Sequence, residues 1–230
     1  MNDAAIRPLL YPLLLGGVHV DELPTGSTRA DVVHITPSFM HGYELKGDAD
    51  TLKRVPNQLK CYSQAYDLVS FVVTQRHVPG LMAQLPNWAG ILVATEEGLA
   101  TLRPAQPHEQ VRRRSLAFLL LAEEVKAFLK SRGEKGLSRL RNHELGSWLA
   151  SAEHIPLPEL GAFVRQQLID RLPQRLQRRE QAKLERQQHA IARQQRKDEL
   201  RALMARYAAE DPDYYVRYQA PLLEAELQRL

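Results

Sequence analysis

The chain has 230 residues, of which 44% are hydrophobic and 25% are charged, and its formal net charge is +4 at pH 7. This composition is typical of a folded soluble protein, and the lack of any run of about 18 apolar residues excludes a transmembrane helix. The single cysteine, Cys61, excludes an intrachain disulfide and a multi-cysteine zinc site, and the absence of a signal-peptide pattern leads us to expect a cytoplasmic protein.

The first 36 residues predict one helix followed by two strands. Residues 3–15 are rich in leucine, contain two prolines that make the helix irregular, and end at Gly16-Gly17. Residues 18–23 alternate between apolar and polar side chains, and residues 29–36 are rich in β-branched residues, as in strands. We expect the leucines of the helix to cover the sheet.

The next segment, His41-Gly-Tyr-Glu-Leu-Lys-Gly-Asp-Ala-Asp50, places a carboxylate and an amine two residues apart in a short apolar run. Successive side chains of a strand point to opposite faces, so Glu44 and Lys46 share one face and Tyr43 and Leu45 share the other. We expect Leu45 to lie in the core.

Pro37-Ser38 lies midway between these two strands and predicts a hairpin in which the numbers of opposed residues sum to about 75. Asp31 then lies opposite Glu44, with Cβ atoms about 5 Å apart. Because proline is disfavoured in a two-residue hairpin loop, a longer loop with a shifted register is the alternative. Facing carboxylates predict a hard divalent cation between them, Mg²⁺ or Mn²⁺.

Glu22, at the end of the first strand, is a candidate third acidic ligand. No spacing rule ties Glu22 to Asp31, so the alternative is an ordinary solvent-facing strand residue.

Two motifs carry a family resemblance. Asp31, followed after twelve positions by Glu44-Leu45-Lys46, resembles the D…E-x-K core of the PD-(D/E)XK nuclease superfamily, although Ala30 replaces the proline of the name. Gln58-Leu-Lys-Cys-Tyr62 is similar to the Q-x-x-x-Y element of the RecB-like branch. More closely, residues 43–62 resemble a family of small bacterial and phage proteins of this superfamily with a poorly defined role, and weaker similarity extends to about residue 172.

The resemblance implies an α/β (α+β) fold in which a restriction-endonuclease-like mixed sheet with an αβββαβ core is flanked by helices. It also implies a metal-dependent nuclease that hydrolyses phosphodiester bonds, with DNA as the expected substrate. The residues implied in catalysis are Asp31, Glu44, Lys46, Gln58 and Tyr62, and those implied in binding Mg²⁺ (or Mn²⁺) are Asp31, Glu44 and the backbone carbonyl of Leu45. Lys46 is expected to stabilise developing charge or orient the attacking hydroxide, and Gln58 and Tyr62 to position the substrate.

After the hairpin, the spacing of apolar residues predicts a helix from about residue 52 to 66, with a break at Pro56 as an alternative. Residues 68–74 and 88–95 read as buried strands, separated by a helical piece at residues 80–85. We therefore expect a nuclease-like domain over residues 1–110.

Residues 111–164 predict a small helical module. One helix is expected from Ser115 to Ser131, followed by a loop carrying Arg139 and Arg141 before a second helix. This arrangement superficially resembles small helix-loop-helix DNA-binding modules, and ordinary packing of a helical module is the alternative.

Residues 165–230 predict a long basic helix and an acidic C-terminal tail. Residues 165–206 hold 12 lysines and arginines against 5 aspartates and glutamates, and a helical pattern runs from residue 159 to about 209. The basic surface predicts attraction of a polyanion, with a merely solvated surface as the alternative. The apolar stripe is thin, so a projecting helix is expected, with a homodimer through this helix left open.

Two other classes of function stay open beside the nuclease. One is a catalytically inactive nucleic-acid-binding or assembly protein that keeps the fold. The other is a scaffold whose long helix binds a protein partner. The intact set of Asp31, Glu44 and Lys46 favours the nuclease.

Overall fold

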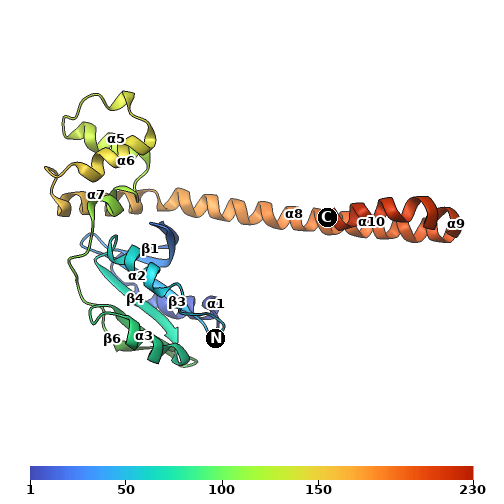
Figure 1. Cartoon of the computed structure of the whole chain (residues 1–230), viewed down its shortest axis with the longest axis horizontal. Helices are drawn as coiled ribbons and strands as arrows, with labels where there is room; N and C mark the ends of the chain where they lie inside the picture. The colour runs from blue at the N-terminus through green and yellow to red at the C-terminus, as the bar shows by residue number, and fades with distance from the viewer. Residues whose placement is uncertain (230) are drawn as a thin grey trace. The chain divides into compact units, whose positions relative to one another are not determined.

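The computed structural model describes residues 1–229, apart from the side chains of residues 138 and 142, and it forms two compact units, Met1–Leu172 and Pro173–Leu230 (Figure 1). The segments expected at residues 1–110 and 111–164 both lie in the first unit. The boundary expected near residue 165 falls inside helix α7 (Leu157–Asp170).

The first unit is built on one six-stranded mixed sheet, which confirms the expected α/β class. The strands are β1 (Val18–Thr25), β2 (Thr28–Ile35), β3 (Met40–Lys46), β4 (Leu68–Thr74), β5 (Gly90–Thr95) and β6 (Gly98–Arg103), in that spatial order. The pairs β1–β2, β2–β3 and β5–β6 are antiparallel, whereas β3–β4 and β4–β5 are parallel. The expected αβββαβ order of elements is present.

Strand β6 is the one strand of this sheet that the sequence analysis did not predict. Its side chains are exposed or half-buried along its whole length, so its sequence shows no hydrophobic alternation. It forms because it pairs with β5 at the edge of the sheet.

Helices cover both faces of the sheet. Helix α1 (Asp3–Leu10), continued by a 3₁₀ helix (Tyr11–Leu13), packs Ile6 and Leu10 into a cluster with Tyr43 and Leu45. Helix α2 (Val55–Ser63) packs Val55 and Tyr62 into the larger core on the opposite face. Pro56 lies in the first turn of α2, where a missing N–H costs nothing, so it starts the helix and does not break it.

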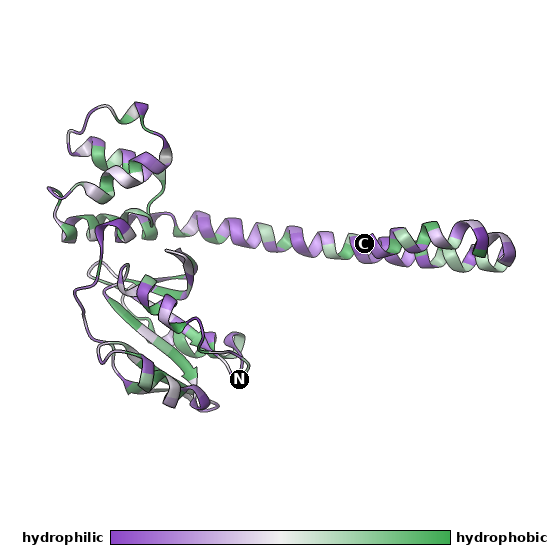
Figure 2. Ribbon diagram, viewed as in Figure 1, coloured by the Kyte–Doolittle hydropathy of each residue, from purple (hydrophilic) through white to green (hydrophobic). Residues whose placement is uncertain are grey.

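A short 3₁₀ helix (Gln75–His77) and helix α3 (Val78–Gln84) connect β4 to β5. Figure 2 shows the central strand β4 in hydrophobic colours along most of its length, as expected for a strand covered on both faces.

The hairpin register confirms the sequence prediction. Val32 pairs with Tyr43 and Ile35 pairs with Met40, so opposed residue numbers sum to 75. The loop holds residues 36–39 and is closed by a bond from the Thr36 N–H to the Phe39 carbonyl (3.0 Å). Pro37 lies inside this longer loop, where it needs no ladder hydrogen bond.

The helical module of the first unit contains more helices than expected. It consists of α4 (Arg113–Ala117), α5 (Ala122–Ser131), a 3₁₀ helix (Leu137–Arg139), α6 (Asn142–Ser151) and α7. The single helix expected over residues 115–131 is wrong, because Glu124 accepts a hydrogen bond from the Leu121 N–H (2.7 Å) and starts a new helix there. Arg171 fixes this break by bonding both Glu124 (2.9 Å) and the Leu119 carbonyl (2.6 Å).

The second unit is helical. It contains most of α8 (Leu172–Glu210), then α9 (Pro212–Tyr214), a π-helical turn (Tyr215–Gln219) and α10 (Ala220–Arg229). The uninterrupted helix expected from residue 159 to 209 is corrected by a break at Arg171, since Pro173 lacks the N–H that would continue the helical ladder. Helix α10 folds back on α8, where Arg196 pairs with Glu226 (2.6 Å) and Leu200 and Leu223 are buried.

Within residues 1–229, no helix has the length and apolar character needed to cross a membrane.

Gly42 provides a test of the packing between β3 and Tyr66, which lies between α2 and β4. A Cβ at this position would lie 2.3 Å from Cδ2 of the buried Tyr66. The Tyr66 hydroxyl is hydrogen-bonded to Thr25, so the ring has little freedom to move away. We expect Gly42→Ala to lower the free energy of unfolding by about 2–3 kcal/mol, measured by urea denaturation.

Gly146→Ala in α6 is the matched control. Its Cβ would meet Phe118 Cε1 at 3.6 Å, an ordinary contact. Because alanine has a higher helix propensity than glycine, we expect this substitution to raise the free energy of unfolding by up to about 1 kcal/mol. Equal denaturation midpoints for Gly42→Ala and the wild type would contradict the packing of Tyr66 over β3.

Candidate functional site

A polar cavity of about 230 Å³ lies where the β1–β2 turn, β2, β3 and the start of α2 meet. Its lining residues are Ser27, Thr28, Arg29, Asp31, Glu44, Arg54, Asn57 and Gln58. The cavity therefore contains both carboxylates that the sequence places opposite each other, together with two cationic side chains.

Glu44 is the buried centre of this site, with only 2% of its surface exposed. Its Oε1 accepts hydrogen bonds from the Lys46 ammonium and the Gln58 amide, and the Tyr62 hydroxyl donates to Oε2 at 2.5 Å. Glu44 and Lys46 share a face of β3, and Gln58 and Tyr62 share a face of α2, as the sequence spacing predicts. The structure thus brings four of the five expected catalytic side chains into direct contact.

Asp31, the fifth, lies beside them on β2. Its Oδ2 accepts a hydrogen bond from the Leu45 N–H at 2.7 Å. Burial and the nearby charge of Glu44 raise the pKa of Asp31 to about 7, from an ordinary value of 3.8. Near neutral pH, this pair of carboxylates therefore favours uptake of a proton or a cation.

Leu45 contributes through its backbone, because its side chain packs with Tyr43 on the α1 face of the sheet. Its N–H holds Asp31 in place, and the expected ligation of a metal by its carbonyl stays a prediction.

Glu22 is not brought to the carboxylate pair. Its backbone has a φ of 56°, which lies in the left-handed region, and its side chain forms ion pairs with Arg7 (3.0 Å) and Arg29 (2.5 Å). It does not line the cavity. In this structure Glu22 orients Arg29, which does line the cavity, and its expected role as a third ligand stays a prediction.

The cationic side of the cavity was not predicted from the sequence. Arg29 lies two residues before Asp31 on β2, and Arg54 lies four residues before Gln58, so strand and helix periodicity place both on the faces already assigned to the site. Those two spacings are the signal that could have identified them.

Arg139 and Arg141 are exposed on the helical module, and neither lines the cavity. The backbone N–H of Arg141 donates to Glu144 (2.6 Å) and so starts helix α6. A role of the two arginines in DNA binding stays a prediction.

The donor set fits a hard cation such as Mg²⁺. The cavity offers two carboxylates, and Oε1 of Gln58 is buried without a hydrogen-bond partner in the described part of the chain. No cluster of three histidine, cysteine, aspartate or glutamate side chains with the geometry of a metal site occurs among the described residues. Mg²⁺ suits such a site, since it commonly binds one or two carboxylates and completes its shell with water and phosphate oxygens.

The raised pKa of Asp31 makes a prediction about stability. The folded pKa (about 7) exceeds the unfolded value (3.8), so the stabilising contribution of the protonated group is complete below about pH 4 and is lost as the pH rises through 7. We expect the free energy of unfolding, measured with urea in the presence of EDTA, to fall between pH 5 and pH 8. The fall should be on the order of 2 kcal/mol larger for the wild type than for Asp31→Asn.

Asparagine keeps the acceptor for the Leu45 N–H, so the variant tests the charge alone. Glu97→Gln, in the exposed β5–β6 turn, is the control and should keep the wild-type pH profile. Parallel pH profiles for wild type and Asp31→Asn would show that Asp31 does not titrate between pH 5 and 8.

Comparison with known proteins places the chain in a family. A family model described as bacteriophage P4 protein cII matches residues 16–219. No curated protein matches the chain. Among solved structures, a protein of unknown function from Silicibacter pomeroyi is similar, with 21% sequence identity, a TM-score of 0.36, and coverage of 46% of this chain and 70% of that one. Because the family match spans most of the sequence, this chain belongs to the bacteriophage P4 cII protein family.

Proposed function

We propose that this protein is a metal-dependent nuclease that hydrolyses phosphodiester bonds, with DNA as the expected substrate. The observation that carries the proposal is the convergence of Asp31 and Glu44 in one polar cavity, with Lys46 bonded to Glu44. The raised pKa of Asp31 supports it, because carboxylates that repel each other in the free protein are stabilised by a bound cation.

Asp31 and Glu44 would hold the cation, Mg²⁺ or Mn²⁺. When bound, such an ion supplies Lewis acidity and lowers the pKa of a coordinated water. Lys46 is only 2% exposed and lies against Glu44, and its ammonium would donate to a phosphate oxygen bound next to that carboxylate. Gln58 and Tyr62 hold Glu44 in a single orientation from α2.

The cationic lining of the cavity supports a phosphodiester as substrate. Arg29 and Arg54 place two guanidinium groups around the carboxylates, and Asn57 adds an amide. Guanidinium groups bind phosphate oxygens in a two-pronged geometry, so these arginines would hold the backbone on either side of the scissile bond.

One observation favours a second candidate, a catalytically inactive nucleic-acid-binding or assembly protein with the same fold. Both oxygens of Glu44 already accept hydrogen bonds from protein donors. A carboxylate whose two oxygens both accept hydrogen bonds from the protein is stable without a metal, and the cavity would then be a structural remnant.

A nuclease assay decides between the two candidates. Supercoiled, linear and single-stranded DNA, and RNA, would be incubated with the protein in Mg²⁺, Mn²⁺ or EDTA, for the wild type, Asp31→Asn and Lys46→Gln. We expect cleavage with either metal, none in EDTA, and a loss of roughly 100-fold or more in each variant.

Glu97→Gln matches the charge change of Asp31→Asn and serves as its control, and circular dichroism would establish that the two site variants remain folded. Unaltered cleavage by Asp31→Asn would reveal a contaminating nuclease. If no substrate is cleaved while DNA binding is unchanged in Asp31→Asn, the inactive binding protein is the correct description.

A separate prediction concerns DNA binding by Arg139 and Arg141. If both contact phosphates, replacing both by glutamine weakens binding uniformly across sequences. It also reduces the slope of log K against log salt by roughly 2, since each phosphate contact contributes about 0.9. Fluorescence anisotropy between 50 and 200 mM NaCl measures the slope, and an unchanged slope would assign both arginines to the solvated surface of the module.

A further inference from the structure

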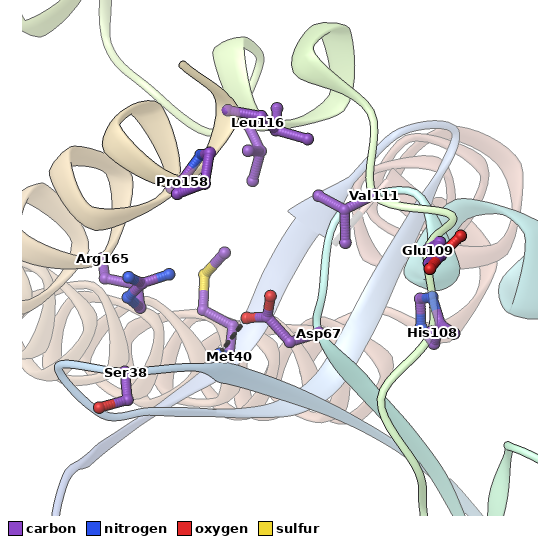
Figure 3. Close-up of a pocket in the computed structure, with 11 residues that line it drawn as sticks. Ser38, Met40, Asp67, His108, Glu109, Val111, Leu116, Pro158 and Arg165 are labelled. Atoms are coloured by element: carbon purple, nitrogen blue, oxygen red, sulfur yellow. Dashed lines mark hydrogen bonds between the residues drawn. The ribbon is translucent and has the colours of Figure 1, made fainter.

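The first unit contains a second, larger cavity that the proposed nuclease chemistry does not use. Its volume is about 430 Å³, within the range of pockets for small organic ligands. It lies between the start of β3, the segment before β4, the 108–111 segment, α4 and α7 (Figure 3). It shares no lining residue with the Asp31–Glu44 cavity, and Met40 lies four residues before Glu44 on β3, about 13 Å along the strand.

One side of this cavity is suited to an anion. The Arg165 Nε donates to the Pro37 carbonyl at 2.9 Å, which fixes the guanidinium beside the loop that carries Ser38. Figure 3 shows Arg165 and Ser38 on the same side of the cavity. Among residues 1–229, no carboxylate pairs with Arg165, so its two terminal nitrogens remain available as a fork for phosphate.

Asp67 supplies a fixed acceptor further along the cavity. Its Oδ2 accepts the Met40 N–H at 2.7 Å, the dashed bond in Figure 3, and this bond orients the carboxylate. In the described part of the chain, no group donates to its Oδ1. A ligand with two adjacent N–H groups could donate both hydrogen bonds to the Asp67 carboxylate.

His108 supplies a donor near Asp67. Its Nδ1 accepts the Gln110 N–H at 3.3 Å, which leaves the proton of the neutral ring on Nε2. Burial lowers the pKa of His108 below its ordinary value, so the ring is neutral at pH 7. Nε2 is buried and has no hydrogen-bond partner among the described residues, and Trp88 holds the ring by packing against it at a centroid distance of 4.2 Å.

The walls between these polar groups are apolar and suit the faces of a flat ring. They consist of Met40, Val111, Leu116, Leu157, Pro158 and Gly161, and Glu109, next to His108 in the sequence, completes the lining.

We propose that this cavity binds a guanine nucleotide, with the base held by Asp67 and His108 and the phosphate by Arg165 and Ser38. Guanine presents the O6 acceptor beside the N1–H and N2–H donors on one edge, which complements a donor beside a carboxylate. Adenine presents the reverse pattern, with a donor at N6 and an acceptor at N1, so its N1 would face the carboxylate without a proton between them.

Isothermal titration calorimetry of the full chain tests the proposal with GMP, AMP, guanosine and inorganic phosphate. EDTA in every sample prevents a nucleotide from binding through a cation at Asp31, so this proposal and the nuclease proposal can fail separately. We expect GMP to bind at least 10-fold more tightly than AMP, and guanosine and phosphate to bind more weakly than GMP. Equal affinities for GMP and AMP, phosphate binding as tight as GMP, or no GMP binding at millimolar concentration would each overturn it.

Two variants locate the binding to this cavity. In Asp67→Asn, the amide oxygen keeps the Met40 N–H and the amide NH₂ turns a donor toward guanine N1–H, so GMP affinity should fall at least 10-fold. Arg165→Gln should reduce GMP affinity to that of guanosine, while Glu97→Gln keeps the wild-type value. Wild-type GMP affinity in Asp67→Asn would refute the assignment, and the GMP-to-AMP ratio of the wild type decides the question if that variant does not fold.

A guanosine 5′-phosphate at the end of a nucleic-acid strand carries the same groups as GMP. A 5′-phosphorylated oligonucleotide beginning with guanosine is therefore titrated as well. Binding tighter than that of GMP, with the same loss in Asp67→Asn, would identify a strand end as the source, whereas GMP binding alone identifies the free nucleotide.

Discussion

The structure of the first unit depends on how it accommodates one buried carboxylate. Glu44 is 2% exposed, and a charge in that position costs several kcal/mol unless donors surround it. Lys46 comes from the same strand, whereas Gln58 and Tyr62 come from α2, and the Tyr62 hydroxyl also lies 2.8 Å from the Arg29 carbonyl on β2. The position of α2 over the sheet, and with it the shape of the polar cavity, follows from satisfying that charge.

Strand β3 links the two cavities of the unit. Its first residue, Met40, lines the larger cavity and donates its N–H to the Asp67 carboxylate, whereas Glu44 lines the smaller cavity. Because both side chains lie on the same face of a strand that is paired on both edges, a ligand in one cavity and a substrate in the other would contact the same strand. The polar groups of the larger cavity come from segments far apart in sequence, which meet only when α7 and the 108–111 segment pack against the sheet.

Local periodicity explains why so much of the smaller site could be predicted. The two-residue spacing of Glu44 and Lys46, the four-residue spacing of Gln58 and Tyr62, and a hairpin centred on Pro37-Ser38 determine which side chains face each other. The features that escaped prediction depend on tertiary contacts. Glu22 adopts a left-handed backbone between two arginines, β6 forms only through its pairing with β5, and the break before α5 is fixed by Arg171, which lies 47 residues from Glu124. The spacing of residues along the sequence does not predict contacts between such distant segments.

Helix α8 is under a very different constraint from β3. Its 39 residues span roughly 58 Å at about 1.5 Å per residue, and Leu200 is its buried residue. Figure 2 shows the helix mostly in hydrophilic colours. A helix with almost no interior places few demands on the shape of its side chains, so most substitutions along it leave the free energy of folding nearly unchanged provided that they keep helix propensity. Substitutions around Glu44 differ in this respect, because each of them would leave a buried charge or one of its hydrogen-bond donors without a partner.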